Sequence, residues 1–156
     1  MSQANVEAIR RLFEGVEERD LEAYLAACHP EVVIREPESL PYGGEYRGLD
    51  GAKRHAVGWL RTWGDLQPGD TRKLGATFHD AGDTVIVRWR LRARAPGSEE
   101  VELDAPVVGV YRLRDGELVA SRMFYADTVL VAQFLADASR AKARSNGRGG
   151  AGSRRV

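Results

Sequence analysis

The 156-residue sequence contains a single cysteine, Cys28, and only three histidines, His29, His55 and His79. One cysteine excludes an internal disulfide, and these residues show none of the spacings of a metal-binding motif. We therefore expect neither a metal nor a cofactor, with a reducing, cytoplasmic setting as the default. The histidines are interpreted as structural or surface residues unless the fold brings one of them to a pocket.

Long apolar runs are also absent. No stretch approaches the roughly 20 residues that a membrane-spanning helix needs, and the N-terminus MSQANVEAIRR lacks the charged-then-apolar pattern of a signal peptide. The sequence therefore predicts no membrane association. Its 43% hydrophobic and 29% charged residues are typical of a globular protein, and the length suits one domain with a buried core.

Acidic residues are missing from the C-terminal end. Six of the 23 basic residues lie from Arg140 onward, which leaves 17 basic and 23 acidic residues before it. This Gly-, Ser- and Arg-rich end has almost no bulky apolar groups to offset its ordering entropy. We therefore predict one domain over residues 1–139 and a disordered basic tail over residues 140–156. Because no aromatic residues interleave the basic ones, we expect no nucleic-acid partner.

The first half of the chain has the periodicity of helices. An amphipathic helix is predicted by apolar residues that recur at helical spacing, namely Val6, Ile9, Leu12, Phe13 and Val16. Asp20 is expected to cap a second, shorter helix with the sequence LEAYLAAC. Gly48 or Asp50 opens a third helix, whose broad face carries Ala52, His55, Ala56, Trp59, Leu60 and Trp63.

The second half changes to the two-residue alternation of strands. Strands are expected at residues 73–79, at 85–94, at about 99–114 and, after the turn RDGE, in LVASRMFYAD. In the second of these, arginines alternate with apolar residues, which predicts one buried and one wet face. An amphipathic segment at 129–143 closes the chain as a helix. Helices followed by antiparallel strands predict an α+β domain with helices packed on one face of a curved sheet.

Residues 31–50, EVVIREPESLPYGGEYRGLD, carry the candidate site. An apolar run predicts a strand, and Glu36 and Glu38 come where that strand ends. The prolines and glycines of PESLPYGG then predict a tight loop, which holds the two carboxylates on a bent segment. Such carboxylates form either a site for proton transfer or an acidic, solvated turn, and this stretch alone does not separate the two.

This order of elements, together with HPEVVIREP, ESLPYGGEYRG and VYRLRDGELVASRMFY, resembles the cone-shaped fold of the nuclear transport factor 2 (NTF2)-like superfamily over about residues 4–130. Within it, the chain is most similar to the ketosteroid isomerase and SnoaL-like polyketide cyclase families. The resemblance implies three N-terminal helices packed on a curved antiparallel sheet and a homodimer through the open sheet face. The fold hosts isomerases, cyclases, epoxide hydrolases and non-catalytic binders, so individual residues must decide the function.

The resemblance also implies that Glu36 is a general base. The two oxyanion donors of the isomerases fall on Leu12 and near Val108 or Gly109, whose side chains cannot donate. If Val108 faces the pocket, strand alternation places Asp104 there as a second catalytic carboxylate; the alternative is that Asp104 is an exposed acid beside Glu102. One carboxylate would then abstract a proton while the other, kept protonated by desolvation and repulsion, donates to a carbonyl or epoxide oxygen.

Glu38 remains a third catalytic candidate, because it also precedes a turn and only the adjacent proline favours Glu36 over it; a register error of one residue would in addition exchange inside for outside. The expected substrate-binding residues are mainly aromatic. They are Tyr42, Tyr46, Trp59, Trp63, Phe78, Trp89, Val108, Ser121, Met123 and Tyr125.

These residues predict a cofactor-independent cyclase or isomerase for a largely apolar carbonyl metabolite, such as a polyketide in natural-product (antibiotic) biosynthesis. Carboxylates would move protons, and an apolar cone would fold the substrate for ring closure. An epoxide hydrolase is the nearest alternative, although it needs an inward arginine that strand alternation does not supply. A non-enzymatic ligand-binding or dimerisation module is the alternative from another class.

Overall fold

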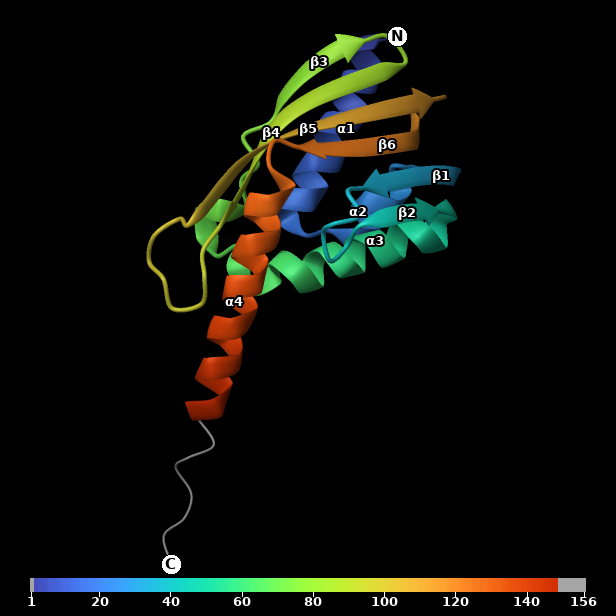
Figure 1. The fold of residues 1–156 in the computed structure, drawn as a ribbon. Coiled ribbons are helices and arrows are strands. Elements are labelled where there is room, and N and C mark those ends of the chain that lie inside the picture. The colour runs from blue at the N-terminus through green and yellow to red at the C-terminus, as the bar shows by residue number, and fades with distance from the viewer. Residues whose placement is uncertain (1, 149–156) are drawn as a thin grey trace, which may run out of the picture.

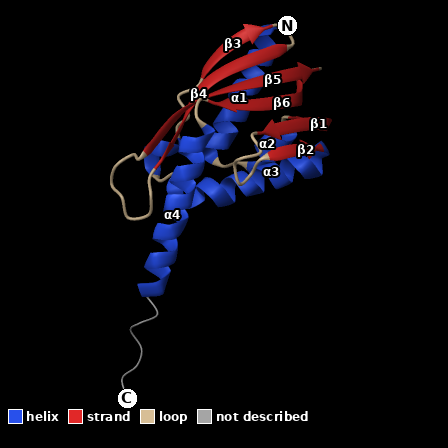
Figure 2. Ribbon diagram, viewed as in Figure 1, coloured by secondary structure: helices blue, strands red, loops and turns tan. Residues whose placement is uncertain are grey.

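The computed structural model describes residues 2–148, in which four helices pack against a curved, unclosed six-stranded sheet (Figures 1 and 2). The helices are α1 (Ser2–Glu18), α2 (Leu21–Ala26), α3 (Gly48–Trp63) and α4 (Thr128–Arg148). The strands are β1 (Cys28–Glu36), β2 (Gly44–Arg47), β3 (Thr77–Ala81), β4 (Thr84–Ala93), β5 (Leu103–Arg114) and β6 (Glu117–Tyr125). Two short 3-10 helices, η1 (Gly64–Leu66) and η2 (Gly69–Arg72), follow α3. The predicted α+β fold is confirmed.

The strand order in the sheet is β2-β1-β6-β5-β4-β3. All neighbouring pairs are antiparallel except β1 and β6, which run parallel, with Ile34 opposite Ser121. This parallel pair differs from the wholly antiparallel sheet that was expected. It places the end of β1, where Glu36 lies, beside the second half of β6.

Helix α1 supplies the centre of the core. Its predicted apolar face is correct, since Ile9, Leu12 and Phe13 are all buried. The Phe13 ring meets Trp89 and Tyr111 of the sheet edge-on, with ring centroids 6.3 and 5.6 Å apart. Such edge-to-face contacts stabilise aromatic pairs beyond the burial of their area. Helix α1 is therefore fixed against the inner face of β4 and β5.

The segment after Glu36 folds into a tight turn followed by β2, which was predicted as loop. Backbone hydrogen bonds from Leu40 N to Pro37 O (3.1 Å) and from Gly43 N to Leu40 O (2.8 Å) close the turn. Gly44 then pairs with Glu36 across the two strands. The glycines that indicated a loop supply this compact return, so that the chain pairs back onto β1.

The alternation of β5 is opposite to the prediction. Asp104 and Val108 lie on the outer face of the sheet, and the Asp104 carboxylate, 47% exposed, accepts a 2.6 Å hydrogen bond from Arg90 Nε. Their predicted placement in a pocket is therefore wrong. The outward Arg112 and Arg114 share their parity, and charged side chains of a half-buried strand favour the solvent face. Gly109 and Tyr111 face inward instead.

Helix α4 continues through Arg148, so residues 140–148, expected in a disordered tail, are helical. Residues 149–156 of that predicted tail lie outside the described part of the chain. Phe134 of α4 stacks on the buried Trp63 of α3, with ring centroids 6.3 Å apart. None of the helices within residues 2–148 has the length and apolar character needed to cross a membrane.

Candidate active site

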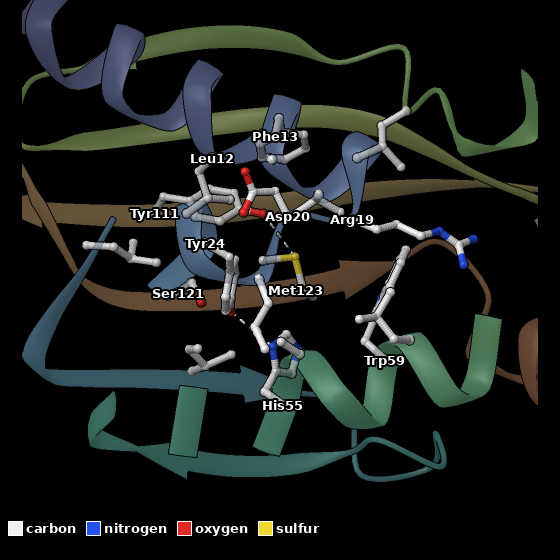
Figure 3. A pocket seen from close by; sticks show the side chains of 18 of the residues that line it. Leu12, Phe13, Arg19, Asp20, Tyr24, His55, Trp59, Tyr111, Ser121 and Met123 are labelled. Carbon is white, nitrogen blue, oxygen red and sulfur yellow. Dashed lines mark hydrogen bonds between the residues drawn. The ribbon is translucent and has the colours of Figure 1, made fainter. Parts of the chain in front are cut away.

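A cavity with an empty volume of about 780 Å³, its open mouth included, lies between α1, α2, α3 and the inner face of the sheet (Figure 3). Most of its lining is apolar. Its polar lining residues are Arg19, Asp20, Tyr24, Glu36, His55, Tyr111 and Ser121. An apolar cavity with a few convergent polar groups has the character of a small-molecule site.

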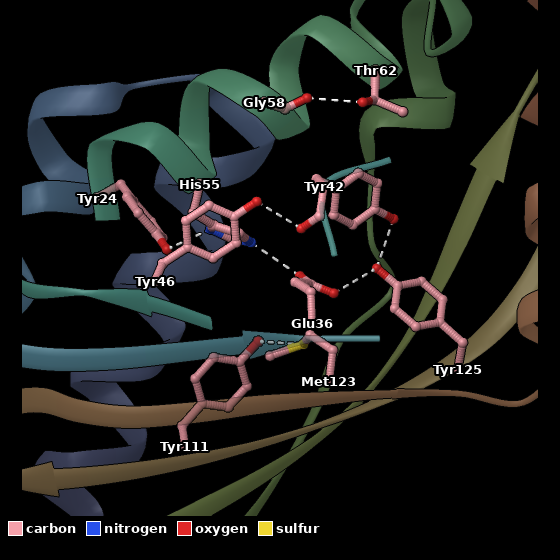
Figure 4. A network of polar contacts seen from close by, with 10 residues as sticks. All are labelled: Tyr24, Glu36, Tyr42, Tyr46, His55, Gly58, Thr62, Tyr111, Met123 and Tyr125. Carbon is pink, nitrogen blue, oxygen red and sulfur yellow. Dashed lines mark hydrogen bonds and ion pairs between the residues drawn. The ribbon is translucent and has the colours of Figure 1, made fainter. Parts of the chain in front are cut away.

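Glu36, the last residue of β1, is the buried carboxylate of this cavity, with only 3% of its side chain exposed. Its Oε1 lies 3.0 Å from His55 Nε2 of α3, and its Oε2 accepts a 3.2 Å hydrogen bond from the Tyr125 hydroxyl of β6 (Figure 4). A buried carboxylate costs free energy unless it is hydrogen-bonded. Each oxygen has one partner, and a carboxylate oxygen can accept more than one hydrogen bond.

A second layer of hydroxyl groups holds these two partners. The Tyr24 hydroxyl lies 3.1 Å from His55 Nδ1, and the Tyr42 hydroxyl lies 2.8 Å from the Tyr125 hydroxyl. When Tyr24 donates to Nδ1, the neutral imidazole carries its hydrogen on Nε2 and donates it to Glu36. Two chains of hydrogen bonds, one from each side, therefore converge on a single carboxylate (Figure 4).

Burial keeps the hydroxyl groups of this site protonated. It raises the pKa of Tyr24, Tyr111 and Tyr125 well above the ordinary value of tyrosine, and the negative charge of Glu36 raises each of them further. Desolvation has this sign because it disfavours the charged phenolate. The hydroxyls consequently act as hydrogen-bond donors across the neutral pH range.

Tyr111 and Ser121 place two more hydroxyl groups in the cavity, from opposite positions on β5 and β6. Among residues 2–148, the Tyr111 hydroxyl donates only to the sulfur of Met123, at 3.5 Å, and sulfur is a weak acceptor. Ser121 is buried, and its hydroxyl has no hydrogen-bond partner in the part of the chain that the structure describes. Gly109 makes room for the tyrosine, because a Cβ there would lie 2.5 Å from the Tyr111 ring.

Several residues predicted from the sequence do surround this site. Those that line the cavity are Glu36, Trp59, Trp89, Ser121 and Met123. Tyr42 and Tyr125 belong to the hydrogen-bond chain on one side of Glu36. The Tyr46 hydroxyl donates to the Tyr42 carbonyl at 2.8 Å, so this residue supports the chain from outside.

Other predicted residues lie elsewhere. Glu38 is exposed in the turn after β1 because the strand ends at Glu36 and the chain bends at Pro37, so the alternation that makes Glu36 point inward does not continue to Glu38. Trp63 is fully buried between Tyr42 and Phe134, and Phe78 packs behind Phe13, so neither lines the cavity. Both serve the core, which is the more common use of large aromatic residues.

Sequence reasoning missed His55, Tyr24, Tyr111 and Arg19 as site residues. His55 shares the predicted inner face of α3 with Trp59, and this was the signal that could have found it. Tyr111 follows from the corrected alternation of β5. Within residues 2–148, no group of three or more His, Cys, Asp or Glu side chains is arranged to hold a metal ion.

The sequence model of a SnoaL-like domain family matches residues 9–121, a range that includes Glu36, His55, Tyr111 and Ser121. The chain belongs to the SnoaL-like domain family. No curated protein matches it. The match to the SnoaL-like family confirms the sequence-based expectation that the chain belongs to the NTF2-like superfamily.

Solved structures support the fold of this SnoaL-like protein. TerC, co-crystallized with polyporic acid, is 24% identical with a TM-score of 0.71, and the match covers 85% of this chain and 98% of TerC. An NTF2-like protein from Burkholderia thailandensis is 28% identical with a TM-score of 0.64, over 83% of this chain and 95% of its own. A Xanthomonas campestris protein of unknown function with a cystatin-like fold is 18% identical with a TM-score of 0.70, over 84% and 97%.

Proposed function

We propose that this SnoaL-like protein is a cofactor-independent cyclase or isomerase that acts on an apolar carbonyl compound, with Glu36 as its general base. The supporting observation is a single buried carboxylate, held by two donors, in the wall of an apolar cavity. The apolar cavity suits a flexible, polyketide-like substrate, and we propose natural-product assembly as the setting.

The first step is removal of a proton from the carbon next to the substrate carbonyl. Glu36 accepts this proton on a carboxylate oxygen, and the electron pair of the broken C–H bond moves into an enolate. The hydrogen bonds of His55 and Tyr125 fix the direction of the carboxylate, and a positioned base contributes roughly 10²- to 10⁴-fold to a rate.

Negative charge then develops on the carbonyl oxygen, and Tyr111 and Ser121 are the groups we assign to it. Their hydroxyls lie in the cavity wall with a weak partner or none, so a substrate oxygen can accept from both. Donors held in place before the reaction stabilise a developing oxyanion more than water does. They take the place of the two oxyanion donors of the ketosteroid isomerases, which fall on Leu12 and near Val108 or Gly109 here.

The fate of the enolate distinguishes a cyclase from an isomerase. In an isomerase, Glu36 returns its proton to a different carbon of the conjugated system. In a cyclase, the enolate carbon attacks a second carbonyl carbon of the same folded substrate, and Glu36 returns the proton to the resulting alkoxide. Confinement in the cavity lowers the entropic part of such a ring closure.

This mechanism uses one carboxylate where the sequence suggested two. Asp104 lies outside the cavity in an ion pair with Arg90, so the same Glu36 must both take and return the proton. His55, which is hydrogen-bonded to Glu36, stabilises the carboxylate before it takes the proton and again after it has returned it.

Deuterium exchange into 2-tetralone, 1-indanone and 2-decalone in D₂O, followed by NMR, tests Glu36 without knowledge of the natural substrate. We expect the wild type to accelerate exchange next to the carbonyl of at least one ketone. Glu36→Gln is expected to lower that rate about 100-fold. Glu38→Gln is the matched control, since Glu38 is exposed one turn away, and it should exchange like the wild type.

Equal rates for the wild type and Glu36→Gln would contradict the proposal. Absence of any acceleration, together with binding of the ketones, would instead favour the non-enzymatic ligand-binding module. Melting curves of both variants establish that each is folded.

A further inference from the structure

Arg19 has an unusual backbone conformation at the corner between α1 and α2. Helix α1 ends in a Schellman motif, with hydrogen bonds from Arg19 N to Val16 O (3.1 Å) and from Asp20 N to Gly15 O (2.8 Å). Arg19 occupies the left-handed position of this motif, at φ 58°. Glycine is the residue that fits this position without strain. The presence of arginine there therefore points to a use for its side chain.

The Arg19 guanidinium lacks a protein partner. Arg19 lines the cavity, and its Nη2 is buried without a hydrogen bond. Within residues 2–148, no carboxylate lies within ion-pair distance of this partly buried guanidinium. Burial, and after it the positive charge of Arg72, lower the pKa of Arg19, while the negative charge of Asp65 raises it. An incoming anion would act in the same direction as Asp65 and favour the charged guanidinium.

The acidic groups around Arg19 are engaged elsewhere. Asp65 forms an ion pair with Lys142, with Nζ and Oδ2 3.1 Å apart. Asp20 also lines the cavity, but its Oδ1 accepts from Ala23 N at 3.1 Å and caps α2. Arg72, which acts on Arg19 through its charge, has a buried Nε without a partner as well. Positive charge with unused donors therefore gathers at this part of the site.

Arg19 and the Glu36 site reach the cavity from different elements. Arg19 lies at the corner of α1 and α2, whereas His55, the partner of Glu36, projects from α3. Figure 3 shows Trp59 between Arg19 and His55 in this view. A ligand in the cavity can thus place an apolar body against Trp59, with one end near Glu36 and the other near the guanidinium.

We propose that Arg19 binds an anionic oxygen of the substrate, a carboxylate or an acidic hydroxyl, and so selects apolar carbonyl compounds that carry one acidic group. The inference deepens the proposed function, because it rests on the same cavity being the substrate site. Arginine suits this task since its planar donors match a carboxylate and its charge persists at any physiological pH.

Equilibrium binding of a matched probe pair tests the anchor, with 2-naphthoate as the anion and 2-naphthalenemethanol as its neutral counterpart. Tryptophan fluorescence at low ionic strength reports both affinities. We expect the wild type to bind the anion about tenfold more tightly than the alcohol, the scale of one charge-assisted hydrogen bond. Arg19→Gln, which keeps a polar side chain but removes its charge, should abolish this preference by weakening the anion rather than the alcohol.

Arg19→Gly and Arg11→Gln complete the design. Arg19→Gly should also lose the preference while melting no lower than the wild type, because glycine fits φ 58°. Arg11 is exposed on α1, so Arg11→Gln should keep the preference. An anion-to-alcohol ratio that is the same in the wild type and in Arg19→Gln would overturn the proposal.

Glu36→Gln separates this proposal from the proposed function. The Arg19 anchor predicts that Glu36→Gln still prefers the anion, whatever its effect on deuterium exchange. If Glu36→Gln loses deuterium exchange but Arg19→Gln keeps the anion-to-alcohol affinity ratio, only the proposed role of Arg19 is contradicted. If Arg19→Gln loses that ratio but Glu36→Gln exchanges normally, only the proposed role of Glu36 as general base is contradicted.

Discussion

At the scale of single residues, the site combines one buried carboxylate with hydroxyl groups that are largely removed from water. Tyr24, Tyr42 and Tyr111 are buried, and Tyr125 is partly buried. Each keeps its proton because a phenolate would lose its hydration, and because Glu36 repels a second negative charge. Such groups link the stability of the fold to pH.

The raised pKa values of these tyrosines predict that the folded protein becomes less stable at alkaline pH. Their pKa values are raised in the native state, so the unfolded chain loses phenolic protons near pH 10 while the native chain keeps them. The contribution of these tyrosines to the free energy of unfolding should therefore be constant below about pH 9 and fall as pH rises above 10. Denaturant unfolding between pH 8 and 11, with absorbance at 295 nm for phenolate, measures both effects. Ionisation of these tyrosines at pH 10 in the folded protein would contradict the assignment.

At the scale of elements, the turn between β1 and β2 positions one side of the site. It carries Tyr42, whose hydroxyl meets Tyr125, and it packs tightly on itself. A Cβ at Gly43 would lie 2.2 Å from the carbonyl oxygen of Pro37 and 2.7 Å from the Cα of Glu38. Because both are backbone atoms, they cannot yield without moving the turn.

Gly43→Ala is thus expected to destabilise the protein by about 1–3 kcal/mol, the usual cost of overpacking, and to weaken the Tyr42–Tyr125 contact. Gly58→Ala is the control. A Cβ at Gly58, inside α3, has its nearest contact at 3.8 Å from Tyr42 Cβ, so this change should stabilise the helix by about 0.5–1 kcal/mol. Chemical denaturation of both variants measures the difference. Equal stabilities would show that the turn adapts more readily than its geometry indicates.

At the scale of the whole molecule, the outer face of the sheet carries apolar side chains beside its arginines. Phe124 of β6 is 51% exposed and pairs with Val108 of β5, and Val110 lies on the same face. The arginine row of β4 is exposed at Arg88 and Arg90, as alternation predicted. The homodimer through this open face, implied by the family resemblance, remains our prediction.

We expect sedimentation velocity at micromolar concentration to show a dimer, and Phe124→Lys to shift it to monomer, because a charge would be buried without a partner. Leu49→Lys is the control. Leu49 is also an exposed apolar residue, 42% exposed, but it lies on α3 rather than on the outer sheet face. A wild-type monomer, or loss of the dimer in both variants, would rule out this interface.

Local patterns in the sequence determined much of this protein. Helical spacing located α1 and α3, the alternation of β4 identified its buried face, and Asp20 was recognised as the cap of α2. Glu36 was found for a local reason as well, since Pro37 ends the strand directly after it. Such features depend on residues within a turn or two of each other, and propensity and periodicity are patterns over the same short stretches of sequence.

Only the tertiary structure decided what surrounds Glu36. His55 is 19 residues away in the sequence and Tyr125 is 89, and no local pattern reports such distances. Tyr111 faces the cavity and Asp104 faces away from it because of the register of β5. A shift of one residue in that register would reverse the direction of every side chain of the strand. The sequence by itself determined most of the helices and strands and the position of the carboxylate at the end of β1. The pairing of β1 with β6 and the packing of α3 brought its partners to it, because contacts between distant segments form only when the whole core is buried together.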